Sequence, residues 1–160
     1  MTKKTSKQKS PAQKSPAQKT LAKKTTKQQT PKLLPYGNAD FKSVRTRKNY
    51  AYVDKTRFIE LLENESNDSK IFIRPRRFGK SLFLSMLAYY YDVNYAGEFE
   101  RLFGDLYIGQ NPTPLKNSYA VMEFDFSGID TSGIGEFRNS FTGNVKQTVI
   151  GFLTSHKNLF

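Results

Sequence analysis

Hydrophobic residues after position 32 follow two different periods, and their order predicts a chain with both strands and helices. Ile71-Phe72-Ile73 is a short β-branched and aromatic run, which is typical of a buried strand. A basic loop follows it. After the loop, apolar residues recur at helical spacing, at Leu82, Phe83, Met86, Leu87 and Tyr90. The pattern therefore predicts a strand, a loop and a helix in succession.

The rest of the chain repeats this alternation. Residues 119–126 predict a second strand, and residues 106–108 predict a shorter one. Residues 99–103 predict a short helix that ends at Gly104, and an apolar stripe predicts a last amphipathic helix from Glu136 to about Ser155. The fold class that follows is α/β, a three-layer sandwich with a mostly parallel sheet like that of P-loop NTPases.

This sheet is predicted to be incomplete. Only two or three strands can be identified, whereas a typical sheet has about five or six. We therefore expect residues 33–160 to be the N-terminal part of a larger P-loop domain and to expose apolar sheet surface. A helix over residues 55–63, with Asp54 as its N-cap, is predicted before the first strand. The three tyrosines 89–91 predict a helix end on the core rather than a platform for bases.

The basic loop has the composition of a phosphate-binding loop. Residues 74–82 are Arg-Pro-Arg-Arg-Phe-Gly-Lys-Ser-Leu. Gly79 lets backbone approach a phosphate, Lys80 can extend its ammonium to the outer phosphates, and the Ser81 hydroxyl can take one position on Mg²⁺. A helix that begins here adds N–H groups without intrahelical partners and a dipole that favours anions.

One position departs from the usual pattern. Arg74 stands where a second glycine is expected, and Pro75 removes one N–H from the loop. An Arg-rich surface turn without a ligand therefore stays open as the alternative. Our prediction is a degenerate phosphate loop that binds ATP and Mg²⁺, with Ser81 on the metal. Its predicted binding residues are Arg74, Arg76, Arg77, Phe78, Gly79, Lys80, Ser81 and Leu82.

Longer motifs in the chain resemble the predicted AAA-ATPase-like family. The resemblance rests on residues 49–56, which contain Tyr-Val-Asp-Lys-Thr, and on residues 74–82, 102–108 and 124–127. It covers about residues 33 to 160.

The resemblance implies that Arg74 is the family's own residue at the position of the missing glycine, and that residues 52–56 wall the base of the nucleotide. Similar members usually continue into a Walker B strand with terminal acidic residues, and often into a PD-(D/E)XK nuclease-like domain. Neither is visible in this sequence. We therefore expect nucleotide binding with weak or absent hydrolysis, and we assign no catalytic residue.

Charge is concentrated in the N-terminal segment. The chain has 26 Lys and Arg against 14 Asp and Glu, and residues 1–32 hold ten of the lysines and no acidic residue. With few bulky apolar residues, this tail is predicted to be disordered. A polycationic tail binds polyanions through counterion release. The second hypothesis is therefore a non-enzymatic nucleic-acid or polyanion binder that uses the tail and the Arg-rich loop; a merely solubilising tail is the alternative.

Other candidate sites are weaker. Asp125 ends the second predicted strand, where it is either a Mg²⁺ contact of Walker B type or a turn residue. His156 is the only histidine and is predicted to be solvated near the chain end; with no cysteine, a zinc site is not expected. No apolar run reaches 18 residues, so we predict a cytoplasmic protein without a membrane partner. An oligomer partner or a further C-terminal region is also expected.

Overall fold

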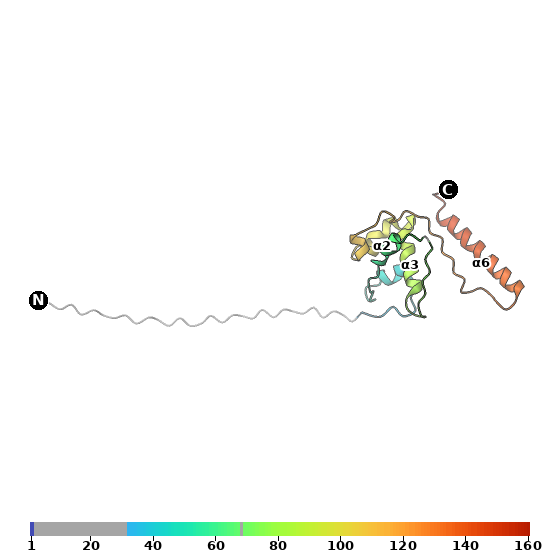
Figure 1. The fold of residues 1–160 in the computed structure, drawn as a ribbon, viewed down its shortest axis with the longest axis horizontal. Helices are drawn as coiled ribbons and strands as arrows, with labels where there is room; N and C mark the ends of the chain where they lie inside the picture. The colour runs from blue at the N-terminus through green and yellow to red at the C-terminus, as the bar shows by residue number, and fades with distance from the viewer. Residues whose placement is uncertain (2–31, 68) are drawn as a thin grey trace.

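The computed structural model describes Met1, residues 32–67 and residues 69–160. The predicted disorder of residues 1–32 therefore falls almost wholly outside the described residues. Figure 1 shows short helices gathered around α3, with α6 lying beside them after a long connection. The helices are α1 (Phe41–Thr46), α2 (Phe58–Asn64), α3 (Lys80–Tyr91), the 3-10 helix η1 (Val93–Glu98), α4 (Phe99–Phe103), α5 (Tyr107–Gln110) and α6 (Ile134–Ser155).

The described residues contain no β-sheet, so the predicted three-layer α/β sandwich is wrong. Their β structure is limited to two isolated parallel bridges, Leu33 with Tyr50 and Asp92 with Tyr119. Apart from the bridge at Tyr119, the two main predicted strands are connections that have no strand partner among the described residues, drawn in green and amber in Figure 1.

The reason is that an extended segment becomes a strand only when a neighbouring backbone pairs with it. The two segments lean on different helices. Phe72 packs edge-on against Phe83 of α3, with ring centroids 5.2 Å apart. Phe126 stacks on Phe141 of α6, with centroids 5.5 Å apart. Each segment therefore contacts a helix through one aromatic side chain, and no hydrogen-bonded ladder forms among the described residues.

Helix α3 is the centre of the core, as its periodicity predicted, although it packs on helices rather than on a sheet. Met86 and Tyr90 are 1% and 0% exposed, and they lie on the face that meets α1 and α4. Because residues three and four apart share a helix face, Leu82, Phe83 and Leu87 extend the same contact. The burial of Tyr90 confirms that the tyrosine cluster is a helix end on the core.

An aromatic cluster joins the other helices to α3. Phe41 of α1 stacks on Phe103 of α4 with ring centroids 4.9 Å apart, and Tyr90 meets Phe103 edge-on at 5.6 Å. Such pairs add about 0.5–1.5 kcal/mol beyond their area burial. The predicted short helix is confirmed as α4, with Gly104 at its C-cap.

The predicted strand over residues 106–108 is wrong, because α5 begins there. Asp54 Oδ2 accepts a hydrogen bond from Tyr107 N at 2.8 Å, and Thr56 Oγ1 accepts one from Ile108 N at 3.2 Å. These are N–H groups of the first helical turn, which lack intrahelical partners. A run of three residues is too short for its period to distinguish strand from helix.

The prediction that Asp54 is the N-cap of the helix that follows it is therefore wrong. That helix, α2, begins at Phe58 with Arg57 as its N-cap. Asp54 Oδ1 closes a local turn by accepting from Thr56 N at 2.8 Å and from Thr56 Oγ1 at 2.7 Å. One carboxylate thus joins the turn before α2 to the start of α5.

Burial alone would raise the pKa of Asp54. The hydrogen bonds from Tyr107 and Thr56, together with the charge of Arg45, outweigh burial and lower this pKa below its ordinary value of 3.8. The ionised carboxylate is therefore the form that the fold prefers.

The last predicted helix is confirmed as α6, but the solvated position predicted for His156 is wrong. His156 is 3% exposed, and its Nε2 lies 3.1 Å from both carboxylate oxygens of Asp92, at the C-cap of α3. A buried imidazole needs such a partner. The two residues are 64 positions apart, so no local pattern could reveal the pair.

We expect Asp54→Ala to lower the free energy of unfolding by roughly 1–3 kcal/mol, because three hydrogen bonds to a carboxylate are removed. Since folding lowers the pKa of Asp54, its contribution is complete above the unfolded value and is lost as the pH falls through the folded value. Urea unfolding should show the largest gap between wild type and variant at neutral pH and a shrinking gap at acid pH. A gap that stays constant into strong acid would contradict this assignment. Glu136→Ala, at an exposed position of α6, is the control.

Candidate phosphate site

The loop before α3 is a tight bend with two residues in the left-handed region. Arg77 has φ 68° and Gly79 has φ 74°, while the residues beside them have negative φ. Glycine adopts this conformation without steric cost, whereas for arginine it is uncommon. Backbone that alternates between right- and left-handed residues turns successive N–H groups toward one side, and such a concave surface binds anions.

As far as the described residues go, the N–H groups of this bend are available to a ligand. The first intrahelical bond of α3 runs from Phe83 N to Gly79 O, at 2.9 Å. In the described part of the chain, no acceptor meets the backbone N–H of residues 76–82. Three of these groups, at Lys80, Ser81 and Leu82, belong to the first turn of the helix, where the dipole places partial positive charge.

Lys80 closes the bend. Its Nζ donates to the backbone oxygen of Arg74, 2.8 Å away, and this contact is exposed. The Lys80 side chain therefore spans the loop back to Arg74. A phosphate oxygen is a stronger acceptor than a neutral carbonyl, so an anion in the bend can take over this donor.

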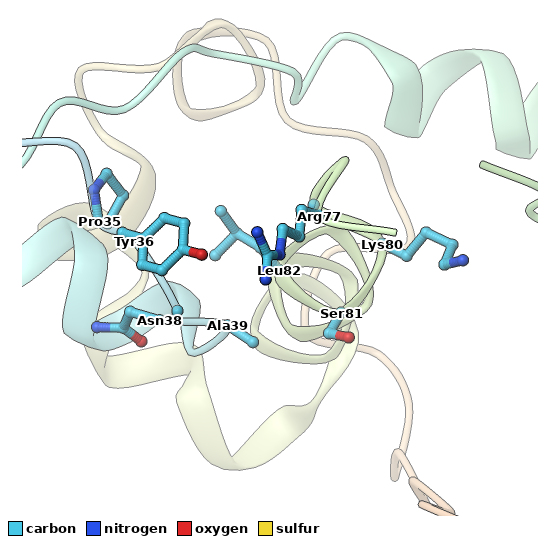
Figure 2. Close-up of a pocket in the computed structure, with 10 residues that line it drawn as sticks. Pro35, Tyr36, Asn38, Ala39, Arg77, Lys80, Ser81 and Leu82 are labelled. Carbon is cyan, nitrogen blue, oxygen red and sulfur yellow. The ribbon is translucent and has the colours of Figure 1, made fainter. Parts of the chain in front are cut away.

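A cavity of about 540 Å³ opens beside the start of α3. Residues 35–39 form one wall, and Arg77, Gly79, Lys80, Ser81 and Leu82 form the other. Figure 2 shows Pro35 and Tyr36 facing the loop, with Lys80 directed to the far side of the helix. The Arg77 guanidinium lies over the Tyr36 ring, 5.6 Å from its centroid, and joins the two walls.

The segment 35–39 is a part of the site that sequence reasoning missed. The signal was present as Pro35-Tyr36-Gly37, a turn sequence in which Gly37 has φ 73°. Its proximity to the loop depends on contacts between residues far apart in the sequence, which no local pattern indicates.

The other three predicted binding residues, Arg74, Phe78 and Arg76, do not line the first cavity. Arg74 and Phe78 line a second cavity of about 550 Å³, on the side of Phe72 and Phe83, which Lys80 also reaches. Arg76 is exposed and lines neither cavity. Five of the eight predicted binding residues therefore line the first cavity, and its facing wall comes from residues 35–39.

The predicted base wall, residues 52–56, lies on another side of the loop. Tyr52, Val53 and Lys55 line a third cavity of about 400 Å³ together with Phe78. Thr56 is fully buried and bonded to α5. A role for this segment in base contact stays a prediction.

Among the residues that the structure describes, no group of three or more His, Asp or Glu side chains could hold a metal. The Ser81 hydroxyl is exposed at the first turn of α3. Asp125 Oδ1 accepts from Ser127 N at 2.9 Å, which is the turn geometry that was the alternative to a metal contact. The bonds from Ser127 lower the pKa of Asp125 below its ordinary value of 3.8.

Residues 35–159 match the family described as "Predicted AAA-ATPase". The chain belongs to this family. The match begins at Pro35, the first residue of the missed wall, and extends over every loop residue of the candidate site. The family that the motifs indicated is therefore confirmed.

One relative of this chain is described as "Uncharacterized protein in vnfD 5'region" and comes from Azotobacter chroococcum mcd 1. It is 48% identical over 58 residues, which are 36% of this chain and 11% of the relative. The chain thus covers about a tenth of the length of that relative. No solved structure matches the chain. None of the described helices combines the length and apolar character that a membrane crossing requires.

We expect Gly79→Ala to lower stability by roughly 1–2 kcal/mol, because an L-residue is strained at a left-handed position. No atom lies within 4 Å of the added Cβ, so the backbone and not a clash is responsible. Gly151→Ala, within α6, is the matched control and should stabilise by about 1 kcal/mol, since alanine favours a helix. Thermal unfolding of both variants checks the signs, and a neutral Gly79→Ala would contradict the strained bend.

Proposed function

We propose that this chain binds ATP, with its phosphates on the bend formed by residues 74–82. The observation that carries the proposal is the Lys80 ammonium held across a loop whose N–H groups meet no acceptor in the described part of the chain. An array of free donors beside a flexible cation suits a polyanion such as a triphosphate. Membership of the AAA-ATPase family supports the same ligand.

The first cavity offers room for the rest of the nucleotide, on the side of the loop away from the Lys80 ammonium (Figure 2). Phosphates on the bend would leave the rest of the nucleotide beside residues 35–39, where the Tyr36 ring offers an apolar surface. The Arg77 side chain, already over that ring, would add positive charge close to the phosphates. We keep the cytoplasm as the proposed location, because the proposed ligand is an intracellular nucleotide.

Mg²⁺ fits the site through a single protein ligand. The exposed Ser81 hydroxyl would hold the ion, with phosphate oxygens and water as its other ligands, which is a usual arrangement for this cation. When bound, Mg²⁺ neutralises phosphate charge.

We further propose that this chain hydrolyses ATP weakly or not at all. Turnover needs a group that positions the attacking water, and usually a carboxylate near the metal. The described residues provide no metal-binding group of acidic side chains, and Asp125 is engaged in its own turn. Binding is therefore the activity that we assign to these residues.

Replacing Lys80 by alanine should weaken ATP binding at least tenfold, since a charge-assisted hydrogen bond of roughly 1.5–3 kcal/mol is removed. Isothermal titration calorimetry with ATP and Mg²⁺ measures the change. Lys48→Ala, which removes an exposed lysine outside all three cavities, is the matched control and should leave affinity unchanged. Equal affinities of wild type and Lys80→Ala would remove the proposal.

A second function is supported by the distribution of charge. The ten lysines of residues 1–32 and the exposed side chains of Arg74, Arg76 and Arg77 suit a nucleic acid or another polyanion. This binding would be electrostatic and without sequence preference, and it does not exclude ATP binding.

Deleting residues 1–32 should weaken DNA binding and flatten its salt dependence. The slope of log affinity against log salt should fall by about 0.9 for each phosphate that the tail no longer neutralises. Fluorescence anisotropy over a salt series measures both quantities. ATP affinity of the same deletion variant should not change. A DNA affinity that is insensitive to the deletion would eliminate the role of the tail.

A further inference from the structure

The second cavity, of about 550 Å³, is lined by α2, by the segment before α3 and by the start of α3 itself. Helix α2 contributes Phe58, Leu61 and Leu62 to its lining, and Phe83 of α3 belongs to it as well. Pockets that hold small molecules have volumes of about 300–1,000 Å³. The second cavity therefore has the size of a ligand pocket.

Six apolar side chains line this cavity, and four of them are phenylalanines: Phe58, Leu61, Leu62, Phe72, Phe78 and Phe83. Phe72 and Phe83 meet edge-on, with ring centroids 5.2 Å apart. Phe58 and Phe78 are 42% and 60% exposed. A flat apolar ligand that covers these two rings would remove apolar surface from water and could stack on them.

Three cationic residues also line the cavity, namely Lys55, Arg74 and Lys80. Among the described residues, Arg74 forms no ion pair, and the Lys80 ammonium donates to a neutral carbonyl oxygen. The one acidic residue of the lining, Glu65, is paired with Lys70 at 3.1 Å. The positive charge at the cavity is therefore not balanced by the residues that line it.

This combination of rings and cations selects the chemistry of the ligand. An apolar surface laid over the cavity would bury the cations without partners, which is costly. An inorganic anion would leave the phenylalanine rings in water. A nucleobase has polar edges that need hydrogen-bond partners, and the side chains of Phe58, Leu61 and Phe83 offer none. A ligand with an apolar body and one anionic group satisfies both parts of the lining.

We propose that the second cavity binds a small aromatic carboxylate. Its rings would stack on Phe58 and Phe78, and its carboxylate would accept hydrogen bonds from the Arg74 guanidinium, whose planar fork matches that group. Figure 2 shows Lys80 directed away from the first cavity, so its ammonium is available to the same carboxylate. The proposal does not rest on nucleotide binding, because Phe58, Arg74 and Phe78 do not line the first cavity.

Isothermal titration calorimetry with 2-naphthoate tests the proposal, and wild type should give saturable binding. The neutral 2-naphthamide has the same rings and should bind about tenfold more weakly, because it lacks the charge that the cations favour. Octanoate keeps the carboxylate without a ring and should also bind more weakly, since stacking is lost. No saturable binding of 2-naphthoate, or equal affinity for either comparison compound, would overturn the proposal.

Two substitutions locate the bound ligand. Arg74→Gln should weaken binding of 2-naphthoate about tenfold, and Phe58→Ala about threefold. The matched controls Arg138→Gln and Phe137→Ala change an exposed arginine and an exposed ring outside all three cavities and should leave the affinity unchanged. Circular dichroism checks that each variant keeps its helices. Wild-type affinity in both test variants, or an equal loss in the controls, contradicts the assignment.

A second measurement observes the cavity itself. In ¹⁵N-labelled protein, 2-naphthoate should shift the amides of Phe58, Leu61 and Phe83 and leave those of residues 36–38 unchanged; the reverse pattern would place the ligand in the first cavity and overturn the proposal.

ATP titration of Phe58→Ala separates the two sites. Its ATP affinity should equal that of wild type, because Phe58 does not line the first cavity. A loss of ATP affinity as large as the loss of 2-naphthoate affinity would assign the second cavity to the nucleotide and overturn the proposal. Binding of 2-naphthoate by a wild type that does not bind ATP would remove the nucleotide proposal alone.

Discussion

The candidate site depends on a helix that begins at Lys80 and whose first N–H groups meet no acceptor among the residues that the structure describes. Burial of Met86 and Tyr90, about two and three turns later, fixes the axis of α3 and therefore the direction of those groups. The left-handed backbone at Arg77 and Gly79 then lets the preceding chain bend around them. Because helix and bend are set by packing and backbone geometry, the donors are oriented before any ligand arrives, which lowers the entropy cost of binding.

Polar contacts between distant residues hold the elements around α3. Asp54 and Thr56 bond to the first N–H groups of α5, and the Tyr91 hydroxyl donates to Glu63 of α2 at 2.9 Å. His156 joins the end of α6 to the end of α3 through Asp92. The contacts of Thr56 and His156 satisfy groups that would be costly to bury alone. Short helices that would be marginal in isolation are therefore stable here because of these tertiary contacts.

The sequence was most informative where local chemistry decides structure. The helical spacing of Leu82, Met86 and Tyr90 predicted α3, and the long apolar stripe predicted α6. The sequence failed where a distant partner decides the structure. Ile71-Phe72-Ile73 has the composition of a strand, but no neighbouring backbone pairs with it among the described residues. His156 is buried against Asp92, a residue 64 positions away. The loop residues around Gly79 were predicted as a group, whereas the facing wall at Pro35 and Tyr36 was not, because only folding brings it there.

The central claim is that the backbone N–H groups at the start of α3 bind phosphate. Titration of ¹⁵N-labelled protein with pyrophosphate, followed by amide chemical shifts, tests it most directly because it observes those groups themselves. The amides of residues 77–82 should shift first and saturate together, while those of α6 stay unchanged. Unperturbed amides at Gly79, Lys80 and Ser81, with shifts gathered elsewhere, would contradict it.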